Sequence, residues 1–316
     1  MRDSYTRFFK HFNIKIDDLI DFGLSDIIYP DCDIVTKYWD ALKIRLLDDK
    51  KAYIRGFGRD AWGTFLFQEF YKITLKNKQI KKDSTNNSEP RKLLEEITGF
   101  SKTKKSNNVL NIMNYQVSHI FGKTKNPFMF TAPWNIAWVP KILDPFTGHE
   151  SKGNYKDKFN KKFIRDVKIK YYSYIVDYNN LMNEYFNESK INSALISIEK
   201  YANGKGVNKR QIVQFKNKIK EELSIIPLDD ANKELEVISS YLKDDKSHRW
   251  IQENILNLKA ASRGGGFEAM KILHEYGIDG TKKGIFINNS ISDELKISDG
   301  KYKEALRSLN KYWEID

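Results

Sequence analysis

Apolar side chains recur every three or four positions over most of the chain, which is the pattern of amphipathic helices. Residues 33–49 begin with Asp33 as a possible N-cap and place four large apolar side chains on one face. A second stripe with the same spacing runs through residues 157–186. The members of the two stripes are Val35, Trp39, Leu42 and Leu46, and Phe159, Phe163, Val167, Tyr171 and Ile175. The pattern therefore predicts a mostly helical protein.

Residues 109–150 break this pattern, with more β-branched and aromatic residues and four prolines. The segment YQVSHIF alternates like a half-buried strand and carries His119 near its end. The segment NIAWVPKI is a candidate second strand, which Asn135 opens. Pro127 and Pro133 restrict the conformations of the loop between the two strands. Two short strands are therefore expected in the middle of the chain.

A helix is predicted to start just after these strands. Thr147 and Glu150 have the spacing of a capping box, which would place His149 in the first helical turn, at the positive end of the helix dipole. The whole pattern predicts an α+β fold, mostly helical, with a small central ββα module. The expected regions are an N-terminal helical part at 1–87, the ββα module with a basic helix at 88–178, and a mainly helical part at 179–316.

Residues 76–90 are polar and have no periodicity, so we predict a linker or an exposed loop there. Ser88 is expected to cap the short helix that follows, and Gly99 to close it.

The composition is that of an ordinary globular protein, with 40% hydrophobic residues. The single cysteine, Cys32, excludes an internal disulfide and a cysteine-based zinc site. No apolar run approaches the length needed to cross a bilayer, and the charged first residues contain no apolar core of a secretory signal. We therefore expect a cytoplasmic protein without a membrane partner.

The net charge of +12 favours a polyanionic partner such as nucleic acid, although AT-rich coding bias is an alternative source of the lysines. The charge is clustered, because residues 151–170 hold eight Lys or Arg against two Asp. Around Gly56 and Gly58 a flexible basic backbone could also meet phosphate, but a turn before a buried aromatic segment explains these glycines equally well. The candidate DNA-binding residues are Lys152, Lys156, Lys158, Lys161, Lys162 and Arg165 in the cluster, and Arg55 and Arg59 beside the glycines.

His119, Asn135 and His149 follow one another in a strand, strand, helix context. Hydrolysis of a phosphodiester needs a base that activates water and a cation that stabilises charge, and histidine titrates near neutral pH. The arrangement resembles the HNH, or ββα-metal, endonuclease family over about residues 109–170. The resemblance implies that His119 is the general base, that Asn135 holds the loop and the imidazole, and that His149 binds Mg²⁺ or another divalent cation. The mainly helical part at 179–316 would then supply DNA binding.

The sequence departs from this family at the metal ligands. Where most members have an acidic ligand just before the first histidine, this chain has Ser118, and a hydroxyl is a poor ligand for a hard cation. Asp144 or Glu150 would have to substitute for it. The zinc-binding cysteine pairs of many members are also absent. The candidate metal ligands are therefore His149, Asn135, Ser118 and Asp144.

A rival pattern overlaps these residues. Asp144 and the run Glu150-Ser151-Lys152 have the D…E-x-K form of another restriction-nuclease fold. That fold needs the E-x-K on a buried strand, and this polar, glycine-bounded segment is a poor one.

The large helical remainder favours a stand-alone, sequence-specific DNA endonuclease of the type II restriction kind. A palindromic target on double-stranded DNA would require a homodimer, with the basic helix following the backbone. A different class stays open, a DNA- or RNA-binding protein without catalysis in which Ser118 marks a lost metal ligand. An RNase on the same scaffold is a further alternative.

Overall fold

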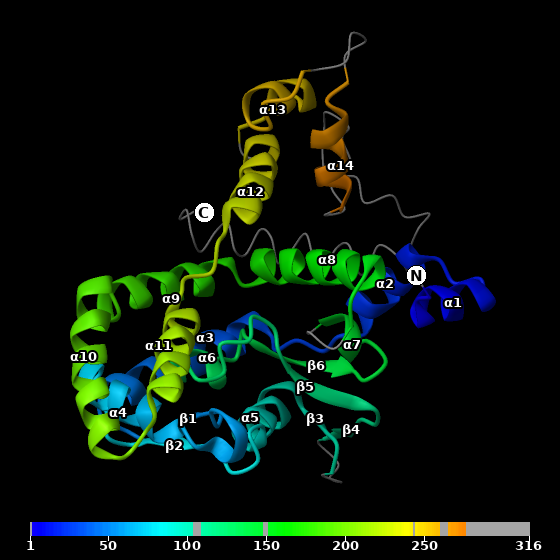
Figure 1. The fold of residues 1–316 in the computed structure, drawn as a ribbon. Coiled ribbons are helices and arrows are strands. Elements are labelled where there is room, and N and C mark those ends of the chain that lie inside the picture. Colours follow the sequence, from blue (N-terminus) through cyan, green and yellow to red (C-terminus); the bar gives the residue numbers. More distant parts are fainter. Residues whose placement is uncertain (1, 104–108, 148–150, 243, 260–264, 276–316) are drawn as a thin grey trace. The chain divides into compact units, whose positions relative to one another are not determined.

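The computed structural model describes residues 2–103, 109–147, 151–242, 244–259 and 265–275. Helices account for most of these residues and the strands are short, which confirms a mostly helical α+β fold (Figure 1). The chain divides into two compact units, Met1–Lys162 with Asp177–Ile225, and Phe163–Val176 with Ile226–Asp316. This division does not follow the three regions expected from the sequence.

The helices of the first unit bury the apolar faces that the sequence predicts. All four apolar residues of the first stripe are buried in α3, but its N-cap is Asp31 and not Asp33. The side chain of Asp31 accepts a hydrogen bond from the backbone N–H of Asp33 at 2.9 Å, so the predicted cap lies two residues too late. The helices are α1 Ser4–His11, α2 Ile16–Asp26, α3 Cys32–Leu47, α4 Thr64–Thr74, α5 Ser88–Thr98, α6 Pro127–Phe130, α7 Asp144–Thr147, α10 Glu188–Gly204 and α11 Lys209–Leu223, with a 3-10 turn at Arg59–Ala61.

Two further helices, α8 (Asn154–Lys170) and α9 (Tyr172–Tyr185), contribute residues to both units. The second apolar stripe runs through both of them and is buried at every position. The predicted helix start at Thr147 is wrong, because this residue ends α7 and residues 151–153 are not helical.

Within its described residues, the first unit has three two-stranded sheets. β1 (Ala52–Ile54) pairs in parallel with β2 (Ile80–Lys82), and β3 (Phe100–Ser101) pairs in parallel with β4 (Leu110–Asn111). β5 (Tyr115–His119) and β6 (Ile136–Pro140) are antiparallel, as the alternation of the sequence predicts. β6 is buried at all five positions, whereas β5 is partly exposed.

The prediction of a linker or an exposed loop over residues 76–90 is wrong, because the segment contains β2 and the start of α5. Ile80 is the one buried residue of β2, so no alternation marks the strand. The N-cap of α5 is Asn87 and not Ser88, and the Asp83 carboxylate accepts hydrogen bonds from the first two backbone N–H groups of the helix. Gly99 closes α5 in a left-handed conformation, as predicted.

The described residues of the second unit include the helices α12 (Asp229–Leu242), α13 (His248–Asn254) and α14 (Phe267–Glu275), which pack against one another. Gln252 is buried among them, and its side chain accepts a hydrogen bond from Glu268 N and donates one to Lys259 O. Among the described residues, no helix combines the length and apolarity that a membrane span requires.

The loop between β1 and α4 has a fixed, strained shape. Gly58 has φ +79°, and the Trp62 indole lies over it and against the Phe57 ring, 5.4 Å between centroids. Asp60 and Ala61 both have positive φ, which is unfavourable for residues with a side chain. The packing between Phe57 and Trp62 thus holds the loop in a conformation that its backbone alone would not favour.

Gly58→Ala is expected to destabilise the protein more than Gly99→Ala. Both glycines have positive φ, but a Cβ at Gly58 would lie 2.0 Å from Trp62 Nε1, whereas a Cβ at Gly99 meets nothing within 4 Å. The free energy of unfolding should therefore fall by about 1–3 kcal/mol more in Gly58→Ala, the cost of overpacking. Urea unfolding followed by tryptophan fluorescence measures the difference, and equal losses would show that the indole moves aside freely.

Candidate functional site

The β5–β6 hairpin brings His119 and Asn135 to the same end. His119 is the last residue of β5 and pairs with Ile136, the first residue of β6. Asn135 precedes Ile136 directly, and its carbonyl accepts a hydrogen bond from Ile120 N at 2.8 Å. Two of the three residues of the HNH-like pattern are therefore close neighbours across the hairpin. The third, His149, lies outside the described residues.

The Asn135 side chain is buried and holds the loop that connects the two strands. Its Oδ1 accepts from Phe121 N at 2.9 Å, and its Nδ2 donates to Met129 O at 3.0 Å and to Gly122 O at 3.3 Å. The side chain is fully inaccessible to solvent. This geometry fits the loop-holding role that the resemblance implies, and it leaves the amide oxygen no exposed side for a metal ion.

His119 is fixed by the same loop. Its Nε2 lies 3.0 Å from Phe130 O, and its ring is stacked on the Phe130 ring at 5.3 Å and an interplanar angle of 10°. A carbonyl oxygen only accepts hydrogen bonds, so Nε2 carries the proton and Nδ1 is the basic nitrogen of the neutral ring. The bond to Phe130 thus selects the tautomer.

Burial lowers the pKa of His119 to about 4. The bond to Phe130 O opposes this shift, and the positive charges of Arg55 and Lys125 add to it. His119 is therefore neutral at pH 7, as a general base must be before it takes up a proton.

Arg55 reaches this site because three loops meet beside the hairpin. Its backbone N–H donates to Thr124 O at 2.9 Å, which joins the end of β1 to the loop between β5 and β6. The next N–H, of Gly56, donates to Asn86 Oδ1 at 2.9 Å, which adds the loop between β2 and α5. The sequence predicts Arg55 as a DNA-binding residue, and its charge acts on the imidazole of His119.

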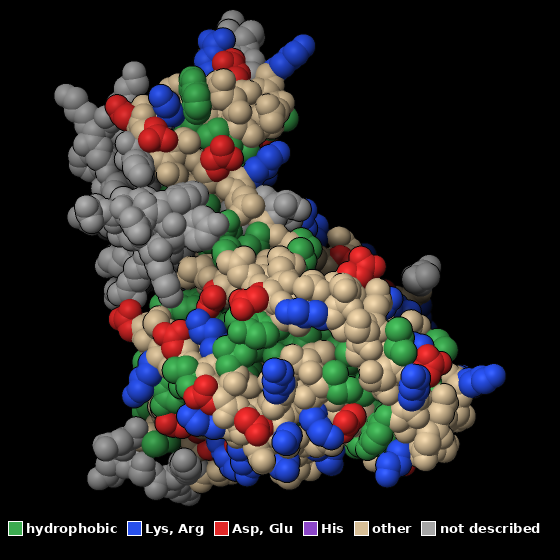
Figure 2. Space-filling model, turned by 90° about the vertical axis from the view of Figure 1, so that its left-hand side faces the viewer, with side chains coloured by type: hydrophobic (Ala, Val, Ile, Leu, Met, Phe, Trp, Pro, Cys, Tyr) green, Lys and Arg blue, Asp and Glu red, His purple; other side chains and the backbone are tan. Residues whose placement is uncertain are grey.

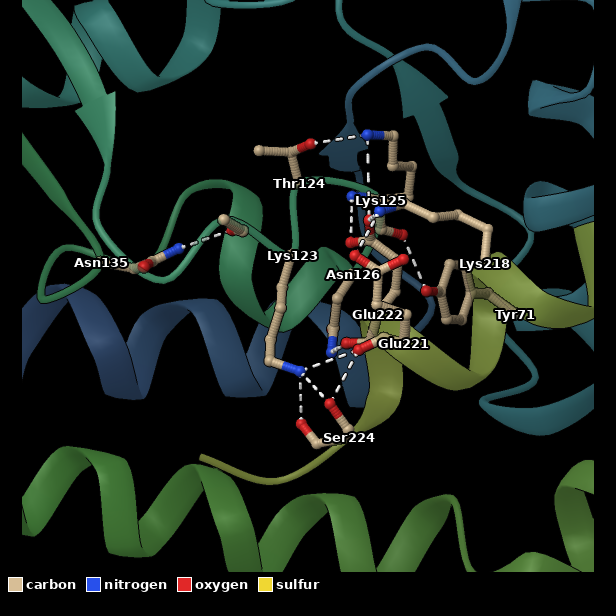
Figure 3. Close-up of polar contacts among 11 residues, drawn as sticks. Tyr71, Lys123, Thr124, Lys125, Asn126, Asn135, Lys218, Glu221, Glu222 and Ser224 are labelled. Atoms are coloured by element: carbon tan, nitrogen blue, oxygen red, sulfur yellow. Dashed lines mark hydrogen bonds and ion pairs between the residues drawn. The ribbon is translucent and has the colours of Figure 1, made fainter. Parts of the chain in front are cut away.

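The loop between β5 and β6 is also clamped by the end of α11, which the sequence does not predict (Figure 3). Lys123 Nζ donates to Glu221 O and Ser224 O, and Asn126 Nδ2 donates to Glu222 O at 3.0 Å. Figure 3 shows both side chains pointing toward this helix end. The loop residues and the helix-end residues are about 100 positions apart in the sequence, and neither segment has a sequence pattern that predicts the contact.

The described residues do not form a metal site by themselves. No group of three or more His, Cys, Asp or Glu side chains within the described ranges could hold a metal ion. Ser118 directly precedes His119 on β5, and successive strand residues face opposite sides, so the two side chains diverge. Asp144 opens α7, where its backbone carbonyl accepts a bond from the Thr147 hydroxyl. A complete ligand set would need His149.

The predicted DNA-binding residues differ in their surroundings. Lys152, Lys158 and Lys161 are exposed. Arg59 is also exposed and lies 3.9 Å from Asp60. The others lie near carboxylates: Lys156 near Asp157 at 3.7 Å, Lys162 near Asp21 at 3.2 Å, and Arg165, in the second unit, near Asp166 and Glu234 at 3.6 Å. On the face drawn in Figure 2, basic side chains are interspersed with acidic ones and form no continuous stripe.

The match to a protein family covers every described candidate site residue named above. The model of the family described as "Uncharacterised protein PM1201" matches residues 30–228, and the chain belongs to this family. A protein of Pasteurella multocida (strain Pm70) with the same description is 44% identical over 212 residues, which cover 66% of this chain and 89% of that protein. No solved structure matches the chain.

The low pKa of His119 predicts a specific loss of stability in acid. Between about pH 6.5 and about pH 4 the unfolded chain binds a proton on this residue that the folded protein does not, so the free energy of unfolding falls as the pH is lowered through that window. His119→Phe keeps a ring on Phe130 but cannot titrate. Urea unfolding at several pH values should show the wild type losing stability relative to the variant, and parallel curves would contradict the shift.

Proposed function

We propose that the protein is a metal-dependent, sequence-specific DNA endonuclease with an HNH-like ββα site. The observation that supports it best is the hairpin: a strand that ends in His119, a loop held by Asn135, and a second strand that Asn135 precedes, with a helix after it. These are the parts that the family resemblance requires, in the same order.

His119 would act as the general base. Its Nε2 proton is bound to Phe130 O, so Nδ1 takes the proton of the attacking water. The water oxygen bonds to phosphorus, the opposite P–O bond breaks, and the leaving oxygen takes up a proton from solvent water. The low pKa makes His119 a weak base in the free protein. A bound phosphate would offset the charges of Arg55 and Lys125 and raise that pKa, so the imidazole becomes a stronger base when substrate is present.

A divalent cation such as Mg²⁺ would stabilise negative charge on the phosphorane and the leaving oxygen. Its ligands would come from His149, Ser118 and Asp144. Because the described donors form no cluster, the proposal depends on His149 for this ion.

The substrate would be double-stranded DNA. The charge of Arg55 acts on His119, and Arg55 and the exposed residues Arg59, Lys152, Lys158 and Lys161 would contact the phosphate backbone. Action as a type II restriction enzyme on a palindromic site would use a homodimer, and a cytoplasmic location would give access to DNA.

The second candidate is a DNA- or RNA-binding protein without catalysis. Two observations favour it: Ser118 stands where the family has an acidic ligand, and the Asn135 amide is used within the loop. Such a protein would keep salt-sensitive binding and show no metal-dependent turnover.

Cleavage of a mixed-sequence plasmid or phage DNA tests the nuclease. With Mg²⁺ the wild type should give discrete fragments and with EDTA none, and His119→Phe should cut at least about 100-fold more slowly, the usual effect of losing a general base. The matched control is His11→Phe, which changes an exposed histidine on α1 and should cut like the wild type. If the protein binds DNA but does not cleave it in Mg²⁺, Mn²⁺ or Ca²⁺, the nuclease is rejected and the second candidate, a nucleic-acid-binding protein without catalysis, is retained.

Arg55→Met should weaken DNA binding through the loss of one phosphate contact. Its backbone bond to Thr124 is kept, so the loop stays in place. The slope of log K against log salt should become smaller in magnitude by about 0.9, the value for one phosphate contact on duplex DNA. Arg210→Met, at an exposed position of α11, is the control and should leave the slope unchanged. An unchanged slope in Arg55→Met would remove Arg55 from the binding surface.

A further inference from the structure

Glu222 is a buried carboxylate in the last turn of α11, with 1% of its side chain exposed. Its Oε2 accepts a hydrogen bond from the Lys125 backbone N–H at 2.8 Å. Its Oε1 lies 3.2 Å from Lys218 Nζ and 3.8 Å from Lys125 Nζ. A buried carboxylate is costly unless cations and hydrogen bonds compensate it, and the loop between β5 and β6 supplies two of these three contacts.

Lys125 connects this carboxylate to the candidate site. Its ammonium donates to Thr124 Oγ1 at 3.1 Å, and Thr124 O accepts the backbone N–H of Arg55. The charges of Lys125 and Arg55 are the two that lower the pKa of His119. Glu222 therefore pairs directly with the cation of Lys125. Through Lys125 and Thr124 it is also connected to the backbone of Arg55.

A second set of contacts joins the same loop to the same helix end without touching the carboxylate. Lys123 Nζ donates to Glu221 O, Ser224 O and Ser224 Oγ at 2.9, 2.7 and 2.5 Å, and so caps the last carbonyls of α11. The charge of Lys123 is not among those that act on His119. Lys123 therefore braces the loop, and bracing alone does not require the charge pair of Lys125 and Glu222.

We infer that Glu222 is a positioning residue of the candidate site, which acts by holding Lys125 so that its cation and that of Arg55 face the His119 end of β5. The inference rests on the proposed function, because a substrate phosphate is the anion that two converging cations would bind. Without this carboxylate the loop keeps its Lys123 brace, but the Lys125 ammonium loses its counter-charge and keeps only the hydrogen bond to Thr124.

The charge state of Lys125 depends on all the groups packed around it. Burial lowers its pKa, Glu222 raises it, Lys218 and Arg55 lower it, and Glu221 raises it. Removing the Glu222 carboxylate lowers the pKa of Lys125 further, so the cation is lost at a lower pH than in the wild type.

The test measures DNA cleavage by Glu222→Gln, Lys125→Met and the double variant, once urea unfolding has shown that each is folded. Glu222→Gln keeps an acceptor for the Lys125 N–H but removes the charge. Each single variant should lower kcat roughly ten- to a hundred-fold, the effect of misplacing a group at the reacting centre. The double variant should lose no more than the larger single effect, because Glu222 acts through Lys125.

Lys123→Met is the matched control. It removes the brace from the same loop and should lower the stability while leaving kcat unchanged. An equal loss of kcat in Lys123→Met, or a wild-type kcat in Glu222→Gln, would overturn the inference.

The pH profile separates positioning from bracing. In Glu222→Gln the alkaline limb of kcat should move to lower pH, because Lys125 loses its proton earlier. Adding Lys125→Arg should reverse that movement, since a guanidinium stays charged throughout the range. An unmoved alkaline limb in Glu222→Gln contradicts the positioning role.

A measurement without DNA keeps this inference distinct from the proposed function. Competitive acetylation of the full-length protein over a range of pH, read by mass spectrometry of the peptide that contains Lys125, reports the pKa of this ammonium. A lower pKa in Glu222→Gln than in the wild type supports the coupling, and an equal pKa contradicts it, whether or not DNA is cut. A wild type that cleaves no DNA contradicts the proposed nuclease instead.

Discussion

The first unit depends on pairing the backbone polar groups of residues 126–140, which are buried without a break. Buried N–H and C=O groups must find partners, and the part of this segment before β6 has no strand beside it to supply them. The side chains of Asn126 and Asn135 supply partners instead. Asn126 caps α6 and also donates a hydrogen bond to Glu222 O. Asn135 accepts a hydrogen bond from Phe121 N and donates to Gly122 O and Met129 O. Loss of either amide would leave several buried groups unpaired, which costs about 1–3 kcal/mol each.

The same constraint determines the state of His119. The carbonyl of Phe130 is a buried acceptor, and the imidazole that satisfies it is thereby held in one tautomer and kept neutral by burial. The bond that satisfies this buried carbonyl therefore also selects the tautomer of His119. The neighbouring cations disfavour the imidazolium in the free protein, and a bound phosphate would reverse their effect. The charge of the imidazole is in this way linked to the presence of an anion.

Local periodicity predicts much of this fold, and contacts distant in sequence are what it misses. The apolar face of α3, the alternation of β5 and the closing Gly99 are visible in short windows, because each depends on spacing along one element. β2 has a single buried residue and gives no alternation. The clamp of Lys125 on Glu222 joins positions 97 residues apart, and a KTKN loop and an EEL helix end look like ordinary exposed segments until the fold brings them together.

His119 alone does not decide between a nuclease and a binding protein, because a buried histidine bonded to a carbonyl is also a common structural feature. The charged pair of Lys125 and Glu222 distinguishes the two functions better than His119 does. The contacts of Lys123 and Asn126 with the end of α11 already hold the loop between β5 and β6 in place, and these contacts bury no carboxylate. The pair of Lys125 and Glu222 adds the desolvation of two charges, and such pairs seldom increase stability. That added cost favours a role for the cation in the site over one in the fold, and the nuclease is the function that uses a cation beside a neutral base.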